Sequence, residues 1–171
     1  VGKSISQIAA ERGHADPADA AFDLLVEEQL AVGMISFGLD EADITAIMRH
    51  PAVSFITDGL MSGRPHPRAY AIYPRILGRY VREQGVLSLE EAVRKMTSLP
   101  ARKIRLRNKG VIAEGYDADL VVFDPDTVID KNSYDDPRVH PAGIAHVLVN
   151  GVFVVEDAAL TGARPGRVIR D

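Results

Sequence analysis

A short apolar run that ends in an acidic residue most constrains how this chain can fold. Residues 53–59 have the sequence VSFITDG, a β-branched and aromatic stretch followed by Asp58 and Gly59. This pattern predicts a buried strand that stops at a carboxylate, where glycine allows a sharp turn. In α/β barrels, carboxylates at the carboxyl ends of strands face the mouth where substrates and metals bind. The sequence therefore points to chemistry at Asp58, with His66 and Arg68 in the loop that follows.

Composition excludes several classes of protein. The chain has 171 residues, of which 46% are hydrophobic, so it can bury the core of about one domain. Its 20 basic and 24 acidic residues are scattered without a basic stripe, and we expect no nucleic-acid partner. No apolar run approaches the length of a bilayer, and no signal pattern opens the chain, so we expect no membrane association and a cytoplasmic protein. The absence of cysteine excludes thiolate metal ligands.

Two helices are expected at the start of the chain. Ser4 precedes apolar residues at helical spacing, and Asp16 with Pro17 forms an N-cap followed by proline at the first helical position. The chain begins at Val1, close to the first of these helix signals. We therefore expect it to be part of a longer protein.

A strand–helix–strand unit is expected next. Residues 31–37 are predicted to form a strand, Asp40 to cap a helix that Pro51 ends, and residues 53–58 to form a second strand. Parallel strands need neighbours and cover on both faces. Two such strands cannot close a sheet alone.

Two further helices should precede the second part of the chain. Residues 68–84 carry apolar side chains at mixed helical spacing, and Gly85 provides a left-handed stop. Ser88 and Glu91 have the spacing of a capping box, in which each side chain binds the other's backbone N–H. The helix that they open should end before Pro100.

From about residue 106 the pattern becomes that of a small β module. The sequence predicts a type I′ hairpin turn at Asn150 and Gly151. The expected strands are residues 110–112, 119–124, 144–149 and 152–155. We therefore divide the chain into residues 1–105 and 106–171.

Several motifs in this order resemble one family. They are Thr57-Asp58-Gly59, Pro65-His66-Pro67-Arg68, the stretch from Tyr73 to Glu83, the stretch from Leu87 to Thr97, the glycine-rich signature of residues 110–125, and the tail at residues 150–151 and 161–167. Together they resemble the carboxy-terminal part of the D-aminoacylases (N-acyl-D-amino-acid deacylases) of the amidohydrolase superfamily. The resemblance covers essentially the whole chain.

The resemblance implies an α/β fold and a zinc-dependent hydrolase. The chain would form the end of a TIM-like (β/α)8 barrel, with its last two strands and helices, followed by part of a small β-sandwich. Residues 31–37 would be the seventh barrel strand and residues 53–58 the eighth. The implied substrate is a small N-acyl-D-amino acid, whose amide bond is cleaved.

The same resemblance assigns roles to three residues. Asp58 matches the strand-eight aspartate, which acts as a metal ligand and as the base and then the acid of the hydrolysis. Arg68 matches a position suited to holding the α-carboxylate of the substrate. His66 lies in the same substrate-binding loop, where we expect it to shape the loop and not to bind metal. The chain departs from the common family pattern at Thr57, Met61 and residues 71–72, and we expect these departures to affect the shape of the loop and not the role of Asp58.

Two functional interpretations remain open. A zinc site needs about four donors, and the five histidines show neither His-x-His nor His-x-x-x-His spacing, so we expect the site to be completed by a missing amino-terminal barrel segment and the isolated chain to be inactive. Alternatively, the chain is a non-catalytic truncated piece that self-associates through exposed strand edges and apolar surface. A related activity, hydrolysis directed at D-glutamate derivatives or dipeptides, would use the same site.

Overall fold

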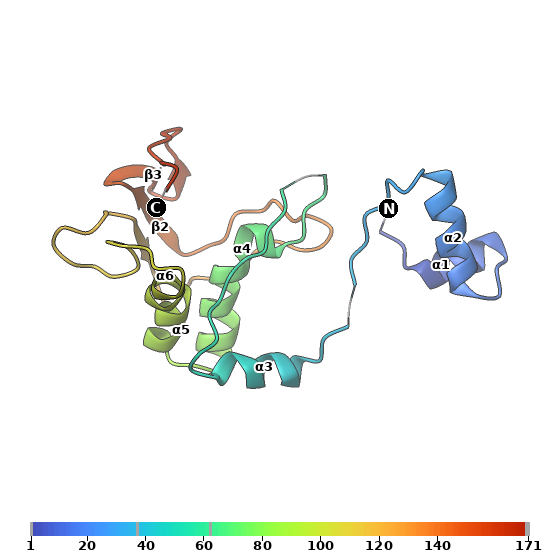
Figure 1. Cartoon of the computed structure of the whole chain (residues 1–171), viewed down its shortest axis with the longest axis horizontal. Helices are drawn as coiled ribbons and strands as arrows, with labels where there is room; N and C mark the ends of the chain where they lie inside the picture. Colours follow the sequence, from blue (N-terminus) through green and yellow to red (C-terminus); the bar gives the residue numbers. More distant parts are fainter. Residues whose placement is uncertain (1, 37, 62, 170–171) are drawn as a thin grey trace. The chain divides into compact units, whose positions relative to one another are not determined.

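The chain forms two compact units, Val1–Gly38 and Leu39–Asp171 (Figure 1). The structure is a computed structural model, and it describes residues 2–36, 38–61 and 63–169. The division expected at residue 105 stays a prediction, and the core of the second unit contains residues from both sides of it.

The first unit consists of two helices, both expected from the sequence. They are α1 (Ile5–Arg12) and α2 (Pro17–Glu27). Ser4 and Gln7 form a reciprocal capping box at α1, and the Asp16 side chain accepts a hydrogen bond from the second residue of α2. These side chains occupy the backbone N–H groups that a helix start leaves without partners.

Small buried residues and an ion pair characterise this helix pair. Ala9 and Ala20 are buried, at 3% and 0% exposure. The Arg12 guanidinium binds both carboxylate oxygens of Glu27, at 2.8 and 2.9 Å. Three large apolar side chains of α2 remain exposed, Phe22 at 66%, Leu25 at 37% and Val26 at 79%. The unit therefore has little hydrophobic core of its own.

The second unit begins with helices. Asp40 caps the first of them, and the helix expected over residues 68–84 lies where the sequence placed it. Its second half is a π-helix, with hydrogen bonds one residue longer than in an α-helix. The helices are α3 (Glu41–Arg49), α4 (Arg68–Arg75), the π-helix η1 (Ile76–Glu83), α5 (Leu89–Met96) and α6 (Ser98–Lys103).

Two details of the next helices differ from the prediction. The Ser88 hydroxyl caps α5 as expected, but the Glu91 carboxylate binds the Arg94 guanidinium, at 2.7 and 2.8 Å. The capping box is therefore only half formed, because an arginine one turn later offers a charged partner. α5 ends at Met96, before Pro100 as expected, but Pro100 lies inside a further short helix, α6, that the sequence did not predict. Proline is tolerated there because the first N–H groups of a helix have no helical partner.

An antiparallel sheet follows the helices. Its strands pair in the order β1-β2-β3-β4. Asn150 and Gly151 join β2 to β3 with φ angles of 48° and 78°, as a type I′ turn requires. Residues 110–112 belong to a loop and not to the expected strand, and Gly110 there has a φ of 79°. The strands are β1 (Leu120–Phe123), β2 (Ile144–Val149), β3 (Val152–Glu156) and β4 (Ala159–Leu160).

The two expected barrel strands are not formed among the described residues. Neither residues 31–36 nor residues 53–58 belong to a strand, and the expected end of the first, residue 37, lies outside the described residues. A strand exists only with a neighbour to pair with, and the Phe55 N–H instead donates to the Lys95 carbonyl at the end of α5, at 2.9 Å. The prediction of strands here was wrong for the chain as described.

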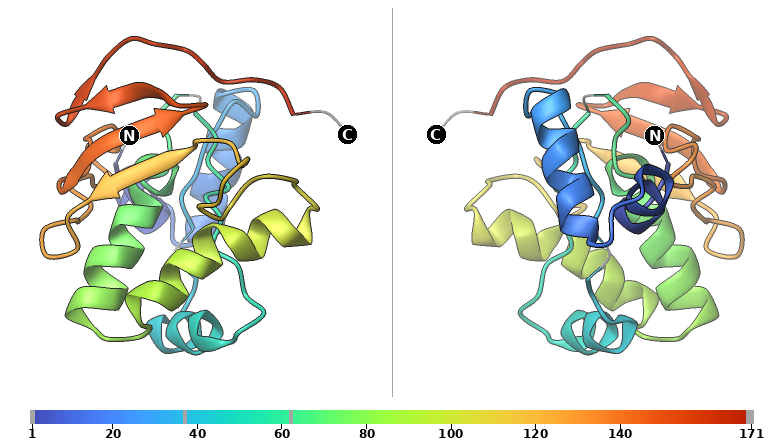
Figure 2. Two further views of the ribbon diagram at one scale, coloured as in Figure 1. Left: turned by 90° about the vertical axis from the view of Figure 1, so that its left-hand side faces the viewer. Right: turned by 90° about the vertical axis from the view of Figure 1, so that its right-hand side faces the viewer.

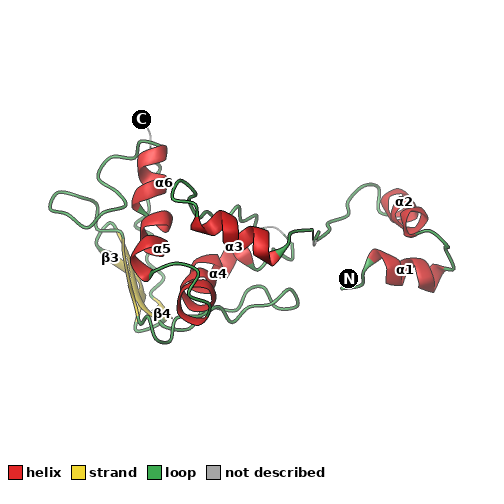
Figure 3. Cartoon of the chain, turned by 90° about the horizontal axis from the view of Figure 1, so that it is seen from below, coloured by secondary structure: helices red, strands yellow, loops and turns green. Residues whose placement is uncertain are grey.

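The core of the second unit lies where the helices meet the sheet. Phe123 of β1 and Ile144 of β2 pack against the buried cluster. Helices α4 to α6 lie on one side of the sheet (Figure 3). In the left view of Figure 2, the strands lie above the green η1. A Cβ added to Gly78 of η1 would lie 2.6 Å from the Val128 carbonyl oxygen, so glycine allows this close approach. The cluster consists of Met48, Phe55, Ile76, Leu77, Tyr80, Val86, Ala92 and Val128.

Among the described residues, no helix combines the length and the apolar character that a bilayer crossing requires.

Candidate functional site

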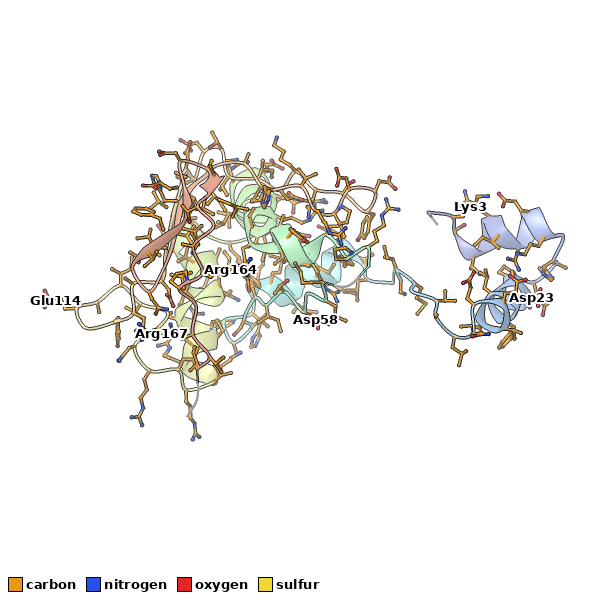
Figure 4. All side chains as sticks on the ribbon, turned by 90° about the horizontal axis from the view of Figure 1, so that it is seen from above. Lys3, Asp23, Asp58, Glu114, Arg164 and Arg167 are labelled. Carbon is orange, nitrogen blue, oxygen red and sulfur yellow. The ribbon has the colours of Figure 1, made fainter. Side chains whose placement is uncertain are left out.

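Asp58 ends the apolar run in a left-handed conformation. Its φ is 44°, a region that aspartate enters more easily than most residues. The side chain lies at the surface of its unit (Figure 4) and is 77% exposed. A Cβ on the following Gly59 would lie 2.9 Å from the Ala69 Cα. Glycine therefore lets the chain pass close to the first turn of α4.

Arg68, the first residue of α4, lies against Asp58. Its Nη2 donates to Asp58 Oδ2 at 2.7 Å, and its Nε donates to the Asp58 carbonyl oxygen at 3.2 Å. Both side chains are well exposed, so the pair adds little stability. What it does is bring a carboxylate and a guanidinium together from positions ten residues apart.

His66 holds the start of α4. Its Nδ1 accepts a hydrogen bond from the Arg68 N–H at 3.0 Å, which requires Nδ1 to be unprotonated. Burial and the charge of Arg68 lower the pKa of the imidazole below its usual 6.5. The Tyr134 ring meets the imidazole edge to face, with centroids 5.2 Å apart. The ring thus takes the place of a side-chain cap, since Pro67 at the N-cap position has no polar side chain to offer.

A second loop, residues 132–138, which the sequence reasoning missed, contacts the loop between Asp58 and α4, here named the Asp58 loop. Asn132 donates from Nδ2 to the Pro67 carbonyl oxygen at 2.8 Å. Arg64 reaches Asp135, and Arg138 donates to a carbonyl oxygen of the Asp58 loop. No motif marks these partners, which lie 65 to 75 residues further along the chain. The only local signal is a polar, turn-forming stretch that ends in Pro137 and Arg138.

The turn that leads into residues 53–58 is held by basic side chains from α5 and α6. Lys95 is fully buried, at 0% exposure, and burial lowers its pKa. Its ammonium lies 5.6 Å from the centroid of the Phe55 ring. These side chains donate to backbone carbonyl oxygens at the end of α3 and just beyond it: Lys95 to Met48 (2.7 Å) and His50, Arg94 to Pro51 (2.8 Å), and Lys103 to Ala52.

The described residues do not form a zinc site by themselves. Zinc in enzymes takes three protein ligands or more, and no group of three or more His, Asp or Glu side chains in the described part of the chain could hold a metal ion. One oxygen of Asp58 faces Arg68, and His66 Nδ1 accepts from the backbone. Asp58 can supply one carboxylate ligand to a site that other residues complete.

Comparisons with known sequences identify relatives over nearly the whole chain. Residues 5–155 match the sequence family described as the amidohydrolase family. The N-acyl-D-glutamate deacylase of Alcaligenes xylosoxydans xylosoxydans is 45% identical over 170 residues, which are 99% of this chain and 33% of that protein. The D-aminoacylase of the same organism is 42% identical over 169 residues, or 98% of this chain and 34% of that protein.

Solved structures agree with the sequence comparison. The N-acyl-D-glutamate deacylase from Bordetella bronchiseptica, crystallised with zinc and a phosphonate inhibitor, matches 99% of this chain and 35% of its own with a TM-score of 0.87 and 43% identity. A D-aminoacylase crystal structure matches 95% of this chain and 33% of its own with a TM-score of 0.85 and 43% identity. The chain spans about a third of the length of these relatives. It belongs to the amidohydrolase family, in the group of the D-aminoacylases (N-acyl-D-amino-acid deacylases).

Proposed function

We propose that this chain carries the last third of a metal-dependent hydrolase that cleaves the amide bond of N-acyl-D-amino acids, and that Asp58 and Arg68 belong to the active site. The observation that carries the proposal is their contact of 2.7 Å on one surface loop. A proton carrier and an anion binder are the two groups that hydrolysis of a carboxylate-bearing amide needs side by side. The similarity to the two deacylases, over 98% or more of the chain, supports the same reading.

We infer that residues 31–36 and 53–58 are the last two strands of a (β/α)8 barrel in the complete enzyme. Large apolar side chains in both segments are exposed, Met34 at 88% and Ile56 at 69%. Neighbouring strands and helices of a barrel would cover such side chains. The later sheet, β1 to β4, would then be part of the small β-sandwich.

Asp58 is suited to move the proton. As a carboxylate it accepts a proton from the attacking water, and as an acid it returns that proton to the amine that leaves. The Bordetella relative was crystallised with zinc. In a complete enzyme that contains this chain, Asp58 would supply one carboxylate ligand to such a zinc ion, and residues beyond the described ones would supply the others. We assign no metal-binding role to His66, whose Nδ1 holds the Arg68 N–H.

Arg68 is suited to hold the substrate. A guanidinium presents parallel N–H donors that match the two oxygens of a carboxylate, and every N-acyl-D-amino acid carries an α-carboxylate. Arg68 is 41% exposed and therefore accessible to a small molecule. His66 contributes indirectly, because it fixes the backbone of Arg68.

Self-association without catalysis is a second candidate, favoured by one observation. Large apolar side chains of the second unit are exposed, including Leu39 at 84%, Leu60 at 80% and Ile112 at 87%. Exposed apolar surface drives association in water. Both candidates predict an isolated chain without turnover, so sedimentation of that chain is combined with the activity of a hybrid enzyme: a stable oligomer together with an inactive hybrid is what this second candidate predicts.

The proposed function is tested by building the complete enzyme. This chain replaces the matching third of the N-acyl-D-glutamate deacylase, and hydrolysis of N-acetyl-D-glutamate and other N-acetyl-D-amino acids is measured with zinc supplied. We expect turnover, and we expect Asp58→Asn to reduce kcat by about 10²- to 10⁴-fold, the usual worth of a general acid–base group. The 171-residue chain alone should show no turnover.

A matched substitution controls for the loss of one negative charge. Asp126 is exposed and distant in sequence from the loop, and Asp126→Asn should leave kcat unchanged. Full activity of the Asp58→Asn enzyme would remove Asp58 from its role. A folded hybrid that binds zinc yet hydrolyses none of the substrates would contradict the proposed function itself.

A further inference from the structure

We propose that residues 132–138, here named the holding loop, position Arg68 for the substrate, and that Asn132 is the positioning residue through which this loop acts. The inference rests on the proposed function, in which Arg68 binds the α-carboxylate. It adds a residue from the β part of the chain that the sequence motifs do not mark.

The holding loop has an internal structure of its own. The Ser133 hydroxyl accepts hydrogen bonds from the N–H groups of Asp135 and Asp136, at 3.2 and 3.0 Å. The Ser133 N–H donates to the Asp136 carbonyl oxygen at 3.0 Å. Pro137 is buried and restricts the backbone further. A loop organised in this way can serve as a fixed support, which a freely moving loop cannot.

Asn132 joins the two loops with a single amide group. Its Nδ2 donates to the Pro67 carbonyl oxygen at 2.8 Å and to the Pro137 carbonyl oxygen at 3.1 Å. One bond therefore reaches across to the Asp58 loop, and the other returns to the holding loop. Because both acceptors are backbone atoms, this link between the two loops does not depend on a flexible side chain at its far end.

The Pro67 carbonyl oxygen is also part of α4. It accepts from the N–H groups of Tyr70 and Ala71, at 3.1 and 3.2 Å, and so closes the first turn of the helix. α4 has no side-chain hydrogen bond at its N-cap. Asn132 therefore fixes the end of a helix whose own cap residue offers no polar group.

Arg68 is the next residue, and its backbone is held at both polar atoms. The His66 ring accepts from its N–H, at 3.0 Å, and Thr57 Oγ1 donates to its carbonyl oxygen at 3.0 Å. The Tyr134 ring of the holding loop packs on the His66 imidazole. Displacement of the first turn of α4 would therefore move the Cα of Arg68 and change where its guanidinium can meet a carboxylate.

The kinetic test compares two asparagines that make the same kind of bond. Asn132→Asp removes the N–H donors but keeps the shape, and Asn150→Asp does the same to an amide that donates to the Pro165 carbonyl oxygen at 2.8 Å, away from the site. In the hybrid enzyme, we expect Asn132→Asp to raise KM for N-acetyl-D-glutamate about three- to tenfold, the worth of one hydrogen bond. We expect kcat to change by less than about twofold, because uniform binding is lost and proton transfer is not.

A substrate without the α-carboxylate separates positioning from general damage. For the α-amide of N-acetyl-D-glutamate, Asn132→Asp and Asn150→Asp should give the same kinetics, since Arg68 has no α-carboxylate to bind. Equal KM values for both variants on the acid substrate would overturn the proposal. So would a loss of kcat in Asn132→Asp with KM unchanged.

Amide hydrogen exchange on the 171-residue chain makes the test independent of activity. Asn132→Asp should speed exchange at Arg68, Ala69 and Tyr70 about three- to tenfold relative to Asn150→Asp. Faster exchange in the Asn132→Asp chain, combined with a hybrid enzyme that shows no turnover, would contradict the proposed function but support the holding role of the loop. Unchanged exchange would contradict the holding role.

A second variant covers the case in which Asn132→Asp does not fold. Tyr134→Leu changes an exposed side chain, 42% accessible, and removes the ring that packs on His66. We expect faster exchange at Arg68 and a shift of the His66 ring nitrogen signals in long-range ¹H–¹⁵N spectra. Unchanged exchange and unchanged ring signals in this variant would overturn the proposal.

Discussion

Replacement of Lys95 by methionine should lower the free energy of unfolding of the second unit by about 1–2 kcal/mol. The side chain is fully buried, and its ammonium donates to the carbonyl oxygens of Met48 and His50. Methionine fills similar space but leaves the buried Met48 carbonyl without this donor, which costs about 1–3 kcal/mol, whereas the carbonyl of the exposed His50 still accepts from the Val53 N–H at 3.1 Å. Relief from burying a charge offsets part of this cost, which gives the range stated.

The same substitution should change how stability depends on pH. Burial lowers the pKa of Lys95 below 10.5, so the unfolded chain binds this proton more tightly than the folded chain does. The stability of the wild-type chain therefore rises with pH between the pKa of Lys95 in the folded chain and 10.5. This added stability is absent at pH values below the folded pKa. The methionine variant lacks this dependence, and the difference between the two proteins should grow toward alkaline pH.

Urea unfolding followed by tyrosine fluorescence provides the assay. The chain has no tryptophan, and its five tyrosines all lie after residue 69, so the signal reports on the second unit alone. Lys103→Met is the matched control, because Lys103 donates to the neighbouring Ala52 carbonyl oxygen from an exposed position, and surface substitutions usually change stability by no more than about 0.5 kcal/mol. Equal losses in the two variants, or a stabilised Lys95→Met chain, would refute the reasoning.

Two further predictions concern the loop and the core. Burial and Arg68 lower the pKa of His66, so the stability that the neutral ring provides should be present above pH 6.5 and lost as the pH falls through the folded value; a ring titration followed by NMR with a midpoint at or above 6.5 would contradict this. Gly78→Ala should destabilise the second unit by about 1–3 kcal/mol in thermal unfolding, although alanine favours helices, because the new Cβ would lie 2.6 Å from the Val128 carbonyl oxygen, a backbone atom. Gly166→Ala, where a Cβ meets nothing within 4 Å, is the control, and an equal effect at both positions would count against the close contact.

Helix starts could be predicted from the sequence because capping is local. Ser4, Asp16, Asp40 and Ser88 each precede a helix, and each side chain accepts a hydrogen bond from a backbone N–H two or three residues later. All the atoms involved lie within one turn, so the residue types alone decide the outcome. The turn at Asn150 was predictable for the same reason.

Features that depend on distant partners could not be predicted. The run at residues 53–58 has strand composition, yet the Phe55 N–H donates to Lys95, 40 residues later, and no strand pairs with it in the described part of the chain. Nothing in the local sequence of residues 76–83 indicates a π-helix. The composition of a segment indicates which of its side chains can be buried. Whether the segment forms a strand depends on the other segments that lie next to it in the folded chain.

The candidate site contains both local features that could be predicted and a distant contact that could not. The motif around Asp58 and Arg68 predicted that the two residues share a loop, and the structure brings their side chains to 2.7 Å. Their catalytic and substrate-binding roles stay predictions. The holding loop could not be foreseen, because Asn132 reaches Pro67 across 65 residues and no residue type at either end marks the pair.

The lysines of α5 and α6 bind carbonyl oxygens at the end of α3, and this affects the order in which the protein folds during synthesis. Lys95 follows the His50 carbonyl that it binds by 45 residues, and Lys103 follows Ala52 by 51. At about 5–20 residues per second, the ribosome makes α3 several seconds before it makes these lysines. During that interval the carbonyls lack their lysine donors, although the His50 carbonyl can already accept from the Val53 N–H, so the turn before Asp58 can reach its final form only after α5 and α6 have emerged.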